Sequence, residues 1–224
     1  ASVAGDDDAR KQLDDKIRRD QDYILKEMDF LQGKLLGLHS GHHEFEFATG
    51  DNSTMRLATA LKAPYLGWMA STRVGMRLNG DPKSGEFVYT IVSMHGTGSA
   101  QAATTDARWL EARIVPAFTA DQYIRGHSCK SVAWSPFERH IIRRKGPFGQ
   151  DIKPVRCLNV GGFSRGYTDG WKSSYVERSG MLPQPVGWAV IRIKEAQRTC
   201  KDQDRAHFGK RTRVLDVEQV TRTP

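Results

Sequence analysis

The strongest constraint on the fold is an amphipathic stretch near the N-terminus, from Asp6 to about Leu38. At about 100° per residue its apolar side chains fall on one narrow stripe, and charged or amide side chains occupy the remaining surface. The stripe comprises Leu13, Ile17, Ile24, Met28, Leu31, Leu35 and Leu38. Aspartates at positions 6–8 suit the positive end of a helix dipole, and Gly37 is a typical stop signal. We predict one long helix with a solvated polar face.

The stripe has two possible partners: the rest of its own chain, or a second copy or another protein. The series Ile17, Ile24, Leu31, Leu38 has the seven-residue period of coiled-coil position a, but the matching d positions are charged. We favour a split use, in which residues 28–38 dock on the chain's own body and residues 13–24 face a partner or second copy. The predicted interface residues are Leu13, Ile17, Ile24, Met28, Leu31 and Leu35.

Beyond residue 38 the sequence is typical of short strands and polar turns. Val74, Met76 and Leu78 alternate with Arg73, Gly75 and Arg77, which is the pattern of a half-buried strand. We predict an α+β fold that is mainly β, with the N-terminal helix followed by an antiparallel β-sandwich or a strongly curved sheet. The expected division is a helical segment, 1–38, and a β-rich body, 39–224, which includes a polar stretch at 196–212.

The net charge of +8 is concentrated in the body. Residues 1–36 carry seven basic and nine acidic side chains, whereas residues 37–224 carry twenty-seven basic and seventeen acidic ones. Such a body attracts polyanions such as nucleic acid or acidic glycans, unless the charges simply solvate a strand-rich surface. The candidate polyanion-binding residues combine a basic cluster with loop aromatics, which supply stacking surface. They are Arg139, Arg143, Arg144, Lys145, Arg165, Tyr167 and Trp171.

Metal-binding side chains are densest between positions 39 and 46. His39, His42, His43, Glu44 and Glu46 lie close together, but their spacing matches no known metal motif. We interpret them as solvated loop residues and predict no catalytic residues, metal or cofactor. A metal-dependent enzyme centred on these histidines is the least favoured of the functional alternatives.

The leading functional hypothesis is a non-enzymatic structural or binding subunit of a filament, fibre, secretion system or other multiprotein assembly, built in through its N-terminal helix. A polyanion-binding module is the alternative. No run of eighteen apolar residues is present, so no membrane span is expected. The first residue is alanine rather than methionine, which favours a processed, secreted, periplasmic or organellar chain. The three cysteines, Cys129, Cys157 and Cys200, fit either one disulfide with a free thiol or three reduced thiols.

Overall fold

The computed structural model describes residues 3–77, 86–97, 103–127, 131–142, 150–162, 167, 175–178, 180, 188–199 and 211–222. The chain divides into two compact units. Unit 1 comprises Ala1–Thr72 with Ser93–His95, and unit 2 comprises Arg73–Val92 with Gly96–Pro224. The boundary falls within strands β3 (Met69–Arg77) and β4 (Glu86–Met94), so these two strands contribute residues to both units.

The N-terminal helix of unit 1 confirms the prediction of an amphipathic helix but is shorter than expected. Helix α1 spans Val3–Met28, and one 3-10 turn, η1, follows at Asp29–Leu31. Gly33 then adopts a left-handed backbone with φ of +70°, which an L side chain would resist. The predicted continuation to Leu38 is wrong, because the Leu38 N–H donates to the Pro64 carbonyl at 2.9 Å instead of to a helix turn.

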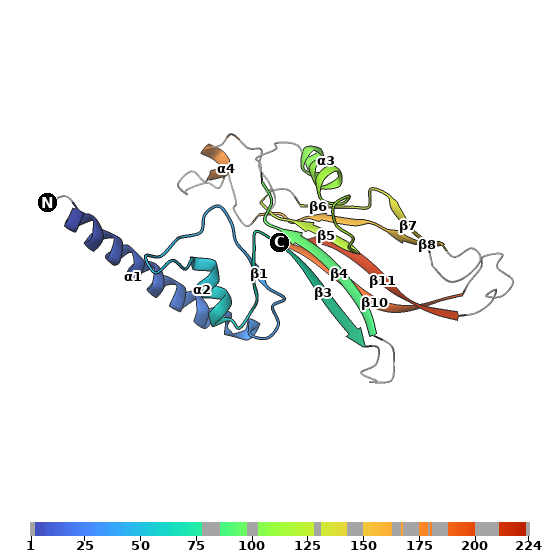
Figure 1. Cartoon of the computed structure of the whole chain (residues 1–224), viewed down its shortest axis with the longest axis horizontal. Helices are drawn as coiled ribbons and strands as arrows, with labels where there is room; N and C mark the ends of the chain where they lie inside the picture. The colour runs from blue at the N-terminus through green and yellow to red at the C-terminus, as the bar shows by residue number, and fades with distance from the viewer. Residues whose placement is uncertain are drawn as a thin grey trace. The chain divides into compact units, whose positions relative to one another are not determined.

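The rest of unit 1 is a short helix with a small parallel strand pair. Helix α2 spans Ser53–Ala60, and Asn52 caps it by accepting a hydrogen bond from the Met55 N–H at 2.7 Å. Strand β1 (Leu38–His39) pairs in parallel with β2 (Tyr65–Gly67). Figure 1 shows α2 running beside α1, which places the two helices of this unit in contact.

Unit 2 is built around a mixed sheet. The strand order is β3-β4-β5-β9-β6, with β5 at Gln122–Arg125, β9 at Arg156–Asn159 and β6 at Val132–Trp134. Strand β9 pairs in parallel with β5 and antiparallel with β6, so the sheet is not wholly antiparallel as expected. The α+β class with mainly β content is confirmed, whereas the sandwich or curved-sheet arrangement stays a prediction.

Helix α3 (Ala103–Arg113) lies in a part of the chain where the sequence predicts short strands and polar turns. It contacts β9 and lies beside the sheet in Figure 1. The Trp134 indole donates to the Glu111 carboxylate, so a polar contact joins the helix to β6. The remaining elements are two antiparallel hairpins and a single helical turn. They are β7 (Glu138–Ile142) with β8 (Gln150–Pro154), β10 (Trp188–Thr199) with β11 (Arg211–Arg222), and α4 (Tyr175–Arg178).

The core of unit 2 contains a buried ion pair. Arg125 Nη1 lies 2.9 Å from Asp106 Oδ1, and both side chains are almost fully buried. The Arg125 guanidinium also lies over the Trp109 ring, 5.1 Å from its centroid, and donates to the Thr97 carbonyl. Charge pairing and these further contacts allow an arginine to replace an apolar residue at this position.

Candidate functional site

The most deeply buried of the described side chains of helix α1 are polar. Asp14 and Gln21 are only 7% and 6% exposed. Asp14 Oδ2 accepts a hydrogen bond from the Ala48 N–H at 3.0 Å, and Gln21 Nε2 donates to the Ser53 carbonyl at 2.9 Å. A spacing of seven residues puts both on one face of the helix. The expectation of a solvated polar face is therefore wrong along this flank.

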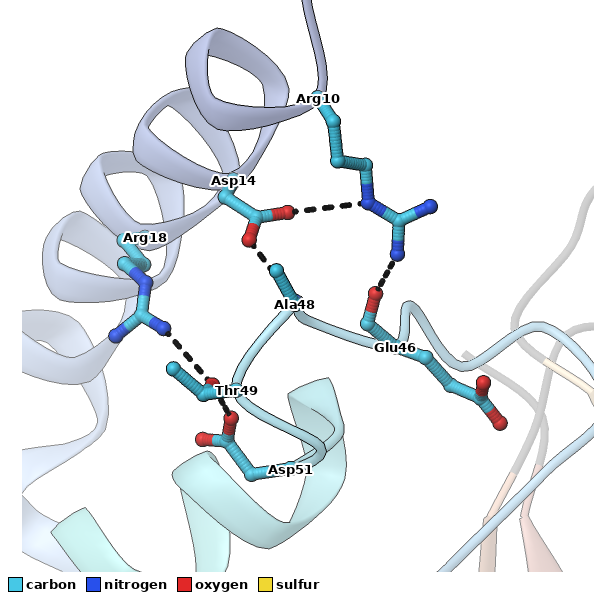
Figure 2. Close-up of polar contacts among 7 residues, drawn as sticks. All are labelled: Arg10, Asp14, Arg18, Glu46, Ala48, Thr49 and Asp51. Carbon is cyan, nitrogen blue, oxygen red and sulfur yellow. Dashed lines mark hydrogen bonds and ion pairs between the residues drawn. The ribbon is translucent and has the colours of Figure 1, made fainter. Parts of the chain in front are cut away.

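Two arginines extend this contact one turn to either side of Asp14. Figure 2 shows Arg10, Asp14 and Arg18 directed at the same loop. Arg10 Nε lies 3.6 Å from Asp14 Oδ1 and its guanidinium lies over the Phe45 ring, 5.2 Å from the centroid. Arg18 lies over the Phe47 ring at 4.6 Å. We call Arg10, Asp14, Arg18 and Gln21 the polar clamp.

The loop that receives the polar clamp is ordered by its own hydrogen bonds. The Phe47 N–H donates to the Asp51 carbonyl, and the Ser53 N–H donates to the Phe45 carbonyl, each at 2.9 Å. The Thr49 hydroxyl donates to the Asp51 carboxylate and lowers the pKa of that carboxyl, with the positive charge of Arg18 acting in the same direction. The loop therefore presents a preformed surface to α1.

Two residues of the apolar stripe, Leu13 and Ile24, remain accessible beside this contact. Leu13 is 45% exposed and Ile24 is 46% exposed, while Ile17 is half-buried. At 3.6 residues per turn, Leu13 and Ile24 point roughly 80° away from Asp14 and Gln21 around the helix axis. The helix is thus fixed by one flank while the neighbouring apolar flank faces outward.

The C-terminal part of the predicted interface is more covered. Met28, Leu31 and Leu35 are half-buried. Shallow grooves of about 390 Å³ and 310 Å³ lie between α1 and α2, and Leu25 lines both. Asp22 and Arg56 form an ion pair of 2.9 Å between the same two helices. The predicted docking of residues 28–38 on a β body stays a prediction.

The histidines are arranged differently from the sequence interpretation. His39 is held by the chain itself, with Nδ1 at 2.9 Å from the Gly67 carbonyl and Nε2 at 2.7 Å from Ser93 Oγ. His43 is exposed. The Glu44 carboxylate accepts a hydrogen bond from the Gly41 N–H at 3.0 Å. These groups therefore do not act as one continuous set of solvated loop residues.

His42 faces a residue that the sequence did not connect with it. His42 Nδ1 lies 3.1 Å from His95 Nε2, just after the end of β4. Trp68 contacts both imidazoles edge-on, with ring centroids 4.7 Å from His42 and 4.9 Å from His95. No pattern near position 95 predicts this pairing, because 53 residues separate the two histidines.

The predicted polyanion-binding residues are mostly outside the described part of the chain. Arg143, Arg144, Lys145, Arg165 and Trp171 fall there. Arg139 lies in β7 opposite Lys153 of β8. Tyr167 is exposed, and its backbone N–H donates to the Glu177 carboxylate. The polyanion surface therefore stays a prediction.

The structure describes one of the three cysteines of the chain, Cys157. Cys157 is a buried free thiol in β9, whereas Cys129 and Cys200 lie outside the described ranges. Within the described part of the chain, none of the helices combines the length and apolar character that a bilayer crossing requires.

Comparison with protein-family models, curated proteins and solved structures finds no match to this chain.

Proposed function

We propose that this protein is a non-enzymatic structural subunit that joins an assembly through the apolar stripe of α1, with a second copy of the chain as its partner. The observation that carries the proposal is that one flank of α1 is buried against its own unit while the neighbouring apolar flank is exposed. Asp14 and Gln21 are buried against the loop of unit 1, while Leu13 and Ile24 each have almost half of their surface exposed to solvent. The polar clamp fixes the helix and leaves an apolar flank for another molecule.

The free energy available on this flank is modest for each side chain and adds up over a symmetric contact. Fully burying a leucine or isoleucine contributes about 1.5–3 kcal/mol, so covering the exposed half contributes roughly 1 kcal/mol. In a two-fold contact between identical helices, each of these residues is buried in both copies, so its contribution counts twice per dimer. A helix of 26 residues, about 39 Å long, is long enough to carry such a contact.

The charges beside the stripe favour an antiparallel pair. In a parallel, in-register pair, Asp20 and Glu27 of each helix would lie beside the same residues of the second copy, and like charges repel. In an antiparallel pair with Leu13 opposite Ile24 of the second copy, Lys16 comes close to Asp20 of that copy. This orientation places apolar residues opposite apolar residues and basic residues beside acidic ones.

The test is the molar mass in solution, measured by light scattering over a range of concentrations. We expect the wild-type chain to dimerise and the Leu13→Asp, Ile24→Asp double variant to remain monomeric, with the melting temperature that the wild type has at concentrations too low for dimerisation. The matched control is Gln12→Asp with Tyr23→Asp, which adds the same charge on another exposed part of α1 and should still dimerise.

A second arm tests the orientation. Lys16→Glu should weaken dimerisation several-fold at low salt, and adding Asp20→Lys should restore it, because the two charges exchange places. A wild-type chain that stays monomeric at every concentration would contradict the proposal. So would a melting temperature of the Leu13→Asp, Ile24→Asp variant below that of the dilute, monomeric wild type, because the stripe would then pack on its own chain.

A further inference from the structure

We propose that His42 and His95 form a two-histidine binding site for a divalent transition-metal ion of the Zn²⁺, Ni²⁺ or Cu²⁺ type. The site is independent of the self-association proposed for α1. It rests on two facing ring nitrogens, on the packing that holds the rings, and on the exposure of one of them. The chemistry is that of imidazole nitrogen, which is a favoured ligand of these borderline ions.

The distance between the nitrogens suits a shared ion. His42 Nδ1 and His95 Nε2 are 3.1 Å apart. Two nitrogens bound to one tetrahedral Zn²⁺ at about 2.0–2.1 Å are roughly 3.3 Å from each other. The present separation of the two nitrogens is therefore within a few tenths of an ångström of that between two adjacent corners of a coordination tetrahedron.

Binding of an ion by two neutral imidazoles requires a change of tautomer in one ring. Two neutral imidazoles at this distance share one hydrogen, so one facing nitrogen donates and the other accepts. For both to bind an ion, the donating ring must carry its hydrogen on its other nitrogen. This is a change of tautomer, and the charge of neither ring changes. The bound ion then takes the place of the shared hydrogen, and water completes its coordination.

The rings are held in place by the surrounding chain. The His95 N–H donates to the Trp68 carbonyl at 2.9 Å. The His95 ring packs so closely on Gly41 that a Cβ at that glycine would lie 3.0 Å from His95 Cε1. The Trp68 ring contacts both imidazoles. A ligand pair positioned before the ion arrives loses less side-chain entropy on binding.

Two histidines close in sequence to His42 serve as comparisons, His39 and His43. Both nitrogens of His39 are engaged by Gly67 and Ser93, so His39 has a structural role. His42 is exposed, which gives an ion access from solvent. His43 is also exposed and adjacent in sequence, and it therefore provides a matched control for non-specific binding by a surface histidine.

The test is isothermal titration of the full chain with ZnCl₂ and with NiCl₂ at pH 7.5. We expect about one ion per chain for the wild type. His42→Ala and His95→Ala should each weaken binding about tenfold or more, as the loss of a ligand does, while His43→Ala binds like the wild type. Circular dichroism establishes that each variant is folded.

A spectroscopic readout identifies the ligands directly. The electron paramagnetic resonance spectrum of the Cu²⁺-loaded wild type should show coupling to two imidazole nitrogens, and His42→Ala should show one fewer. A wild type that binds none of the three ions would overturn the proposal, as would a His42→Ala variant with wild-type affinity. If His95→Ala fails to fold, His42→Ala decides the matter, because the His42 side chain is exposed.

Discussion

The Asp14 carboxylate accepts a hydrogen bond from the Ala48 N–H at 3.0 Å, so a buried acid joins the N-terminal helix to a loop 34 residues further along the chain. We predict that Asp14→Ala lowers the free energy of unfolding of unit 1 by about 1–3 kcal/mol, because the N–H loses a charged acceptor. Urea denaturation followed by circular dichroism measures the change. Hydrogen exchange at the Ala48 amide should accelerate in the same variant.

Two companion variants of Asp14→Ala separate the bond from helix propensity. Asp14→Asn keeps an oxygen acceptor and should lose less stability than Asp14→Ala. Asp15→Ala removes an exposed aspartate one position away and should leave the free energy of unfolding almost unchanged. Equal losses for Asp14→Ala and Asp15→Ala would show that the contact with Ala48 contributes nothing.

The buried pair in unit 2 predicts strong coupling between its partners. Asp106→Ala leaves the Arg125 guanidinium buried without its carboxylate and should cost about 3–5 kcal/mol. The double variant Asp106→Leu, Arg125→Met replaces both charges with apolar side chains and should be more stable than Asp106→Ala. A double-mutant cycle that compares the free energies of unfolding of Asp106→Leu, Arg125→Met and the double variant measures the coupling, and additive losses would contradict it.

The buried thiol in β9 predicts a loss of stability at alkaline pH. Burial raises the pKa of Cys157 to about 12 from the ordinary thiol value of 9.0, with the Glu111 carboxylate acting in the same direction. Between these two values the unfolded chain gives up the thiol proton and the folded chain keeps it. The contribution of Cys157 to stability is therefore fully present below about pH 9 and is lost as the pH rises towards 12.

The matched variant for this titration is Cys157→Ala. Between pH 9 and pH 11 its free energy of unfolding should fall less steeply than that of the wild type, by up to about 1.4 kcal/mol per pH unit for one proton. Tyr89, whose pKa is raised to about 12 by burial, is present in both chains and cancels in the comparison. Parallel curves would mean that the thiol titrates equally in both states.

The amphipathic helix was predictable because periodicity along the chain depends only on local spacing. Its role was harder to predict. Asp14 and Gln21 are polar and were read as solvated, yet their seven-residue spacing places them together on the flank that contacts the chain. Burial of a polar side chain depends on the partner it meets, and Ala48 and Ser53 supply those partners from elsewhere in the sequence.

The remaining differences arise from non-local pairing. Strand β9 lies between β5 and β6, and no local pattern indicates that Cys157 stands opposite Tyr123 in parallel register. Helix α3 was not predicted because Leu110 is the one fully buried aliphatic residue among its described side chains, while Asp106 is buried through its ion pair. The contact of His95 with His42 was not predicted because the two histidines lie in different segments of the chain.

The place of β9 in the sheet also sets an order for biosynthesis. Gln122 of β5 pairs with Arg156 of β9, and Val132 of β6 pairs with Asn159, so both earlier strands await the same later segment. While the ribosome is still short of residue 156, β5 and β6 lack their shared neighbour, and the unpaired edges are open to wrong partners. The pairing of β5 and β6 with β9 is therefore completed only after residue 159 has been made, and any shorter nascent chain leaves these strand edges open to non-native pairing.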